Sequence, residues 1–176
     1  MKKFELTSEF VTFLGKKLFR IKALVAFGDV EEGELGGFVE KEENLDQFGN
    51  AWVSGNARVS GNAQVSGDAQ VSGNAQVSGD AQVSGDAQVS GDAWVYGNAW
   101  VQCCRDYSAA SCFGSEDRTT TFFRTKDGGI GVRCGCFYGT LDEFREKVKE
   151  RHGDRRLAKE YLMLADLMEF RLSKDE

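Results

Sequence analysis

The sequence predicts a mainly β fold in which stacked parallel β-helix coils lie between an N-terminal β cap and a C-terminal α+β module. Three observations predict this arrangement. Residues 49–102 consist of nine consecutive six-residue repeats, two short strand-like segments precede them, and a hairpin pattern with two amphipathic helices follows them. We therefore expect an N-terminal cap over residues 1–30, a β-helix over 31–102 and an α+β module over 103–176.

The N-terminal residues have the pattern of two short strands. Phe4-Glu5-Leu6 and Lys17–Ile21 lie on either side of Gly15, which favours a turn. The end of a β-helix exposes unpaired backbone groups that a protein must cover. We expect the two strands to cover the first coil.

The repeats themselves predict a short strand and a corner in each hexad. Each reads Gly, Asn or Asp, Ala, a variable residue, Val and usually Ser. Ala and Val lie two positions apart, so they share one face of a strand, whereas Gly and Asn or Asp favour turns. A helix would carry a glycine every six residues, at about 1 kcal/mol each. Such short strands are stable only when stacked coils pair their backbones.

The motif Val-Ser-Gly-Asp-Ala-Gln resembles the hexapeptide repeat of left-handed β-helices. The resemblance implies a left-handed parallel β-helix with three hexads in each 18-residue coil, and hence three coils in residues 49–102. Residues 31–48 would form a degenerate fourth coil, with Leu35, Val39 and Leu45 near inward positions. It also implies a homotrimer. Three hexads per coil predict three outward columns: Trp52, Gln70 and Gln88; Arg58, Gln76 and Trp94; Gln64, Gln82 and Trp100.

The C-terminal module begins where the repeat stops. Thr119–Thr125 and Ile130–Tyr138 are predicted to form a hairpin around Asp127-Gly128, a strong turn signal. Thr140 and Glu143 form a capping box before a helix that Gly153 ends. Asp154 is predicted to cap a second helix.

One face of this hairpin is the candidate ligand site. A two-residue turn at Asp127-Gly128 would place Thr120, Phe122, Arg124 and Arg133 together. Arginine offers paired donors to phosphate, and phenylalanine offers a stacking surface to a base. The face therefore suits a small anionic, nucleotide-like ligand. The alternative is a solvated face on which Phe122 and Arg133 form a cation–π pair.

The cysteines are the weaker candidates for a metal site. Cys134 and Cys136 lie two apart on the predicted strand, and Cys103 and Cys104 could approach them from the last coil. Four thiolates would suit structural zinc. The alternative, buried free thiols that behave as small apolar groups, is favoured because the spacing is not that of a zinc knuckle.

Composition and motifs exclude several classes of function. The net charge of −6 argues against duplex nucleic acid as a partner. No apolar run of about 18 residues predicts a membrane span, and no secretory signal is recognisable, so we expect a cytoplasmic location. An acyltransferase of the hexapeptide-repeat type places a His base near a coil boundary. Here the one histidine, His152, lies outside the coils, and no loop interrupts residues 49–102. We expect neither an enzyme nor a cofactor.

The whole chain is similar to uncharacterised bacteriophage and prophage proteins that share a Leu-Gly-Gly-Phe-Val-Glu segment, here Leu35–Glu40, and Gly-Asn-Ala-x-Val repeats. The resemblance implies a phage-type accessory binding protein in the host cytoplasm. Such a protein would inhibit antiviral defence as a sponge for a nucleotide-derived signal, or by binding a host defence protein. The alternative is a structural spacer or assembly protein, and an acyltransferase is less favoured.

Overall fold

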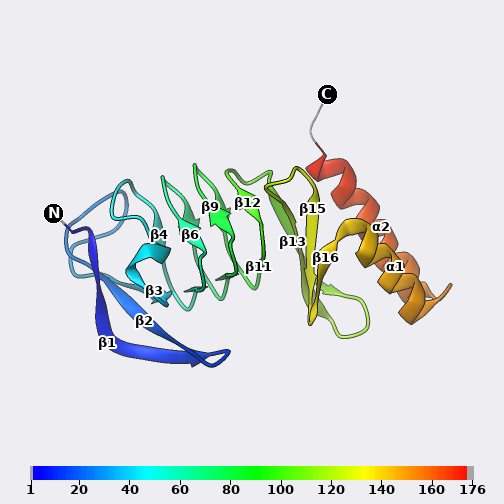
Figure 1. Cartoon of the computed structure of the whole chain (residues 1–176), viewed down its shortest axis with the longest axis horizontal. Helices are drawn as coiled ribbons and strands as arrows, with labels where there is room; N and C mark the ends of the chain where they lie inside the picture. Colours follow the sequence, from blue (N-terminus) through cyan, green and yellow to red (C-terminus); the bar gives the residue numbers. More distant parts are fainter. Residues whose placement is uncertain (1, 174–176) are drawn as a thin grey trace.

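A computed structural model describes residues 2–173 and has the predicted class: a parallel β-helix between an N-terminal β cap and a C-terminal α+β module (Figure 1). Nine two-residue strands form the repeat region and stack in three parallel columns, with partners 18 residues apart. The predicted stacking of the columns is thereby confirmed, but Trp52, predicted to face outward, is 2% exposed because it packs against Phe27 of the cap. The columns are β4 (Trp52–Val53), β7 (Gln70–Val71) and β10 (Gln88–Val89); β5 (Arg58–Val59), β8 (Gln76–Val77) and β11 (Trp94–Val95); β6 (Gln64–Val65), β9 (Gln82–Val83) and β12 (Trp100–Val101).

The interior of the rod contains the alanine and valine of every hexad, all with no exposed surface. Strand and corner N–H groups donate to the coil that follows, as Ser54 N does to Val71 O at 2.8 Å, while alanine N–H groups such as that of Ala57 donate within their own corner. The corner glycines have φ between 61° and 75°, which only glycine adopts without strain. Small inward side chains and glycine corners therefore allow the coils to stack closely.

The polar corners also stack from coil to coil. In three places an asparagine amide donates to an aspartate 18 residues later, at 2.8 to 3.1 Å. These pairs are Asn50 and Asp68, Asn62 and Asp80, and Asn74 and Asp92. Each of these amides donates to a carboxylate oxygen and so links one coil to the next at the corner.

The predicted degenerate coil is present before the first hexad. β3 (Leu35–Val39) pairs with β5 in parallel, and Leu45, after the 3₁₀ helix η1 (Glu42–Asn44), forms a bridge with Val65. Val39 and Leu45 are buried as predicted, but Leu35 is 52% exposed. That prediction is wrong because β3 begins in an antiparallel ladder with the cap, where Leu35 pairs with Lys22.

Two glycines of the Leu35–Glu40 segment are required by close packing. A Cβ on Gly36 would lie 2.6 Å from the Val53 carbonyl oxygen, and one on Gly37 would lie 2.6 Å from that of Ala57. A side chain at either position would push β3 away from the coil it pairs with. The pair of glycines therefore marks the junction between the cap and the rod.

The N-terminal cap is the predicted hairpin, with longer strands. β1 (Phe4–Phe13) and β2 (Lys16–Ala23) are joined by a turn at Leu14 and Gly15, both with positive φ. β2 pairs with β3, so a six-stranded sheet runs from the hairpin into one column of the rod, in the order β1-β2-β3-β5-β8-β11. Figure 1 shows the hairpin projecting from the side of the rod.

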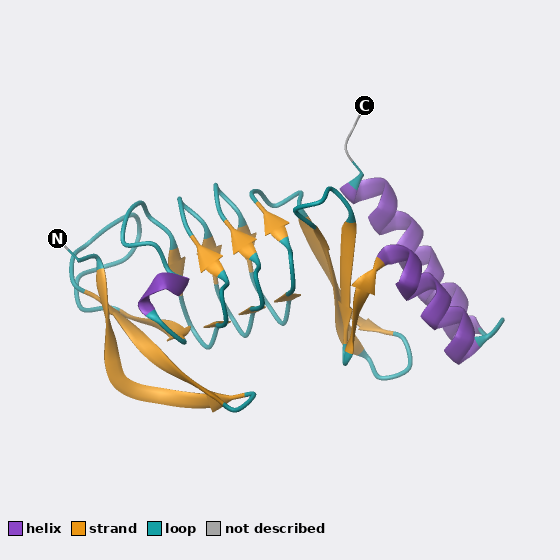
Figure 2. Ribbon diagram, in the orientation of Figure 1, coloured by secondary structure: helices purple, strands orange, loops and turns teal. Residues whose placement is uncertain are grey.

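Four antiparallel strands in the order β13-β14-β15-β16 form the C-terminal sheet. They are β13 (Tyr107–Phe113), β14 (Arg118–Arg124), β15 (Ile130–Cys134) and β16 (Phe137–Thr140). Helices α1 (Leu141–His152) and α2 (Arg156–Leu172) cover the face of this sheet that points away from the rod (Figure 2). The prediction of one strand over residues 130–138 is wrong, because Gly135, with φ of 58°, and Cys136 form a turn.

The helix predictions are confirmed, except for the cap of the second helix. Thr140 N donates to the Glu143 carboxylate at 2.7 Å, and Glu143 N donates to Thr140 Oγ1 at 3.2 Å, as the capping box predicts. Gly153 ends α1 with a φ of 57°. Asp154 does not cap α2, because the helix begins one residue later than predicted and Arg155 occupies the cap position.

Lys3 closes the N-terminal end of the coil interior. Its side chain is 4% exposed, and Nζ donates to the carbonyl oxygen of Ala51 at 2.9 Å and to those of Phe48 and Gly49 at 3.4 Å. Burial lowers the pKa of Lys3 from 10.5 to about 8, although Asp46 opposes the shift.

We expect Lys3 to make the protein more stable as the pH rises from about 8 towards 10.5. Over that range the unfolded chain keeps the Lys3 proton while the folded chain releases it, so deprotonation favours the folded state by at most roughly 3 kcal/mol. The measurement is urea unfolding at several pH values for the wild type and for Lys3→Met, whose difference isolates this group. A ¹⁵N-lysine titration midpoint near 10.5 for Lys3 would contradict the prediction.

Candidate functional site

The predicted register of the β14–β15 hairpin is wrong by one residue. Thr121 pairs with Arg133 and Phe122 with Val132. The connection spans residues 125–129, with Thr125 N donating to Gly129 O at 3.0 Å, rather than a two-residue turn. Because strand faces alternate, a shift of one residue on one strand changes which residues lie side by side. Thr120, Phe122 and Arg124 therefore lie on the opposite face from Arg133.

β14 instead lies between two hydrophobic cores, the interior of the rod and the core beneath the helices. Phe122 has no exposed surface and packs with the helices, its ring centroid 5.9 Å from that of Phe144. Thr120, also fully buried, donates through Oγ1 to Cys134 Sγ at 3.1 Å. On the other face, Phe123 joins the rod interior, and Thr121 Oγ1 accepts from Trp94 N at 2.9 Å.

Arg124 holds the end of α2. Its Nε donates to Leu172 O at 3.0 Å and its Nη2 to Ser173 O at 3.3 Å, and the guanidinium lies 3.4 Å from the Asp106 carboxylate. A cation at the carboxyl end of a helix is favoured by the helix dipole. The partners of Arg124 are thus parts of the chain itself.

Arg133 joins the sheet to the last coil of the rod. Its guanidinium lies 3.9 Å from the ring centroid of Trp94 and 5.2 Å from that of Tyr96. Nη1 also donates to the carbonyl oxygens of Cys136 and Phe137, at 3.3 and 3.4 Å. Burial lowers the pKa of Arg133 below its ordinary value. The four predicted residues therefore share no exposed face.

The cysteines do not converge either. Cys134 faces the helices, Cys136 lies in the turn after β15, and Cys103 follows the last coil, where its thiol lies 3.5 Å from Asp106. All five cysteines are free. Across residues 2–173, no three His, Cys, Asp or Glu side chains are grouped to hold a metal ion. Cys103, Cys104, Cys134 and Cys136 thus form no four-thiolate group.

The structure reveals a different candidate site, a cleft of about 280 Å³ in the C-terminal module. We call it the C-terminal cleft. Phe144, Val148 and Tyr161 form its floor, all less than 8% exposed. Arg118, Lys147 and Arg151 line its rim, with Glu116 as a carboxylate among them. Ligand sites commonly measure roughly 300–1,000 Å³, so this cleft, just below the lower end of that range, suits only a small molecule.

Aromatic stacking shapes the inner wall of the C-terminal cleft. His152 stacks on Tyr161, with ring centroids 5.7 Å apart and planes inclined by 26°. Burial raises the pKa of the Tyr161 phenol above its ordinary value. The phenol is therefore a neutral hydrogen-bonding group at physiological pH. It lies beside the His152 ring, on which an aromatic ring of a ligand could stack.

The rim is basic although the chain is acidic overall. Three cationic side chains accompany one carboxylate at the cleft, whereas the whole chain has a net charge of −6. Lys147 pairs with Glu150 at 2.7 Å and Arg118 with Glu116 at 3.0 Å, but these pairs are exposed and contribute little stability. An incoming anion can therefore compete for the same cations.

Reasoning from the sequence missed this cleft because its walls come from four separated segments. One local signal was available: Lys147 and Arg151 lie four residues apart and so share one face of α1. The contributions of Arg118 and Tyr161 depend on how the sheet and α2 pack, which no local pattern contains.

Comparison with known families supports the rod and leaves the cleft unassigned. The family model for the YdcK β-solenoid repeat matches residues 51–67, 69–85 and 87–102, which follow the successive coils. The matches lie within the rod, and the chain is a repeat β-solenoid protein. None of the curated proteins compared matches the chain. Within residues 2–173, no helix combines the length and apolar character needed to cross a membrane.

We expect Arg133→Ala to lower the free energy of unfolding by roughly 1–2 kcal/mol, because it removes the cation–π contacts with Trp94 and Tyr96 and two hydrogen bonds. Arg133→Lys should recover only part of this loss, since an ammonium cannot stack as a planar guanidinium does. Urea unfolding followed by circular dichroism provides the measurement. The control is Arg118→Ala, an exposed change expected to alter stability by less than about 0.5 kcal/mol; equal losses for the two variants would contradict the interpretation.

Proposed function

We propose that this protein is a non-enzymatic binding protein whose C-terminal cleft holds a small anionic, nucleotide-like ligand. The observation that carries the proposal is the basic rim of Arg118, Lys147 and Arg151 around an aromatic floor, on a chain with a net charge of −6. Arginine and lysine suit phosphate oxygens, while Tyr161 and His152 offer flat surfaces to a ring. The cleft replaces the hairpin face as the proposed place of recognition.

The rod would serve as a scaffold in this function. Residues 49–102 contain no His or Cys and no inserted loop, and every hexad buries its alanine and valine. Such a stack supplies a rigid support and leaves recognition to the ends. We further propose the phage-type role: a sponge in the host cytoplasm that sequesters a nucleotide-derived signal of antiviral defence, or a protein that binds a host defence protein. The similarity of Leu35–Glu40 and the repeats to phage proteins supports this role.

A structural spacer or assembly protein is the second candidate, favoured by the unbroken rod with a cap at each end. The two candidates differ at the cleft, because a spacer needs no basic rim.

The acyltransferase candidate is disfavoured by the position of His152, which stacks on Tyr161 in the C-terminal module rather than between coils. Acetyl-CoA turnover that Arg151→Glu leaves intact and His152→Ala abolishes would favour the enzyme.

The test is isothermal titration of the protein against inorganic phosphate, nucleoside monophosphates, cyclic dinucleotides and ADP-ribose. We expect at least one phosphorylated compound to bind, with affinity that falls as salt rises because the contacts are ionic. Arg151→Glu should weaken binding by tenfold or more, roughly 1.4 kcal/mol, since a carboxylate at the rim repels the anion.

The matched control is Lys149→Glu, which makes the same charge change on an exposed part of α1 outside the cleft. Binding by this variant should stay within about twofold of the wild type. No binding across the whole panel would refute the proposal and favour the structural spacer. An equal loss of affinity in Arg151→Glu and Lys149→Glu would show that the overall charge of the chain, not the cleft, attracts the ligand.

A further inference from the structure

The outer face of α2 carries an apolar stripe with no partner among residues 2–173. Met163, Leu167 and Phe170 are 72%, 56% and 85% exposed. Spacings of four and three residues place them along one face of the helix, opposite the buried face that includes Tyr161 and Met168. Three large apolar side chains in a row on a surface mark a site of association.

The charges that flank the stripe fit a second copy of the same helix. On the wheel of α2, Glu160 and Arg171 lie on the side of the stripe away from α1. If two copies of α2 pack antiparallel about a two-fold axis near residue 167, each Glu160 lies beside Arg171 of the second copy. In the same pairing, Met163 contacts Phe170 of the second copy, and Leu167 contacts its own counterpart. One register therefore satisfies both the apolar stripe and its flanking charges.

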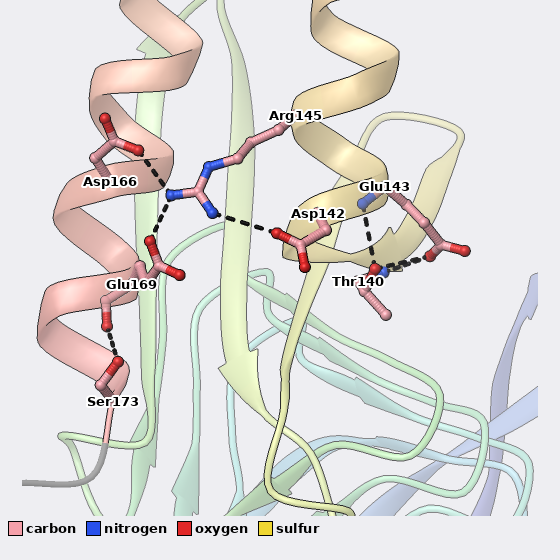
Figure 3. Close-up of polar contacts among 7 residues, drawn as sticks. All are labelled: Thr140, Asp142, Glu143, Arg145, Asp166, Glu169 and Ser173. Carbon is pink, nitrogen blue, oxygen red and sulfur yellow. Dashed lines mark hydrogen bonds and ion pairs between the residues drawn. The ribbon is translucent and has the colours of Figure 1, made fainter.

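The charge on the other flank is already compensated. Asp166 lies near the proposed axis, where two copies would bring like charges together. Arg145 of α1 donates to Asp166 at 2.7 Å and to Glu169 at 2.6 Å, as Figure 3 shows. The guanidinium thus neutralises part of the acidic flank before a second copy approaches.

We propose that this chain forms a two-fold dimer through antiparallel packing of α2 against α2. The helices lie at the end of the molecule farthest from the N-terminal hairpin (Figure 1), so the dimer is an end-to-end pair of rods. An antiparallel pair of identical helices requires a two-fold axis. The pattern therefore commits to two copies, in place of the three that the hexapeptide-repeat resemblance implies. The proposal is independent of the ligand in the C-terminal cleft.

The test is sedimentation equilibrium of the full chain over a range of concentrations, with a reducing agent present because Cys104, Cys112 and Cys136 are exposed. We expect a monomer–dimer equilibrium, with a dissociation constant that rises tenfold or more in Leu167→Glu. Since Leu167 is exposed, this variant should keep the circular dichroism spectrum of the wild type, which shows that the monomer still folds. A monomer at all concentrations, a trimer mass, or a dimer unaffected by Leu167→Glu would each overturn the proposal.

A charge exchange tests the register. Glu160→Lys and Arg171→Glu should each weaken the dimer several-fold, and the double variant should restore it, because the opposite charges then meet again in exchanged positions. Glu160 also accepts from Gly114 N at 3.0 Å, so Arg171→Glu is the cleaner single variant. Lys149→Glu, on α1, is the charge control and should leave the dimer unchanged. A double variant weaker than both single variants would refute the antiparallel register.

Discussion

Coil-to-coil hydrogen bonding is the constraint on which the rest of this structure depends. Each hexad is too short to be stable alone, and its backbone groups find their partners 17 residues along the chain, as Ser54 does in Val71. The first and last coils then have one side without such partners, which must be covered. The N-terminal cap and the C-terminal module, the two non-repetitive parts of the chain, cover these two ends of the rod.

The two ends are closed by different chemistry. At the N-terminal end, the ammonium of Lys3 donates to carbonyl oxygens while β3 continues a column of the rod into the cap. At the other end, β14 presents Phe123 to the rod interior and Phe122 to the helices. β14 thus lies between the rod and the helices, and Arg133 of β15 adds a second contact between the C-terminal sheet and the rod. The basic cleft lies beyond that sheet.

The repeat made the rod predictable, because alanine and valine recur with one period and glycine marks each corner. The strand and corner of each hexad and the capping box at Thr140 were readable from local pattern. The columns and the degenerate coil at Val39 and Leu45 followed from the resemblance, which implies three hexads per coil. The candidate ligand face at Thr120, Phe122, Arg124 and Arg133 was not readable from local pattern, because its faces depend on a register that loop length sets. A five-residue connection in place of two reversed the relation between the strands. β13 and the cleft likewise depend on packing between distant segments.

The absence of any insertion in residues 49–102 gives the hexad number a geometric meaning. Since three hexads complete one coil, gain or loss of three would change the separation of the two ends by about 4.8 Å and keep their orientation. Gain or loss of a single hexad would instead turn the C-terminal module by a third of a revolution about the rod axis. Complete sets of three hexads therefore set the distance between the cleft and the N-terminal hairpin. The one or two hexads left over after complete sets of three would set the direction in which the cleft faces relative to that hairpin.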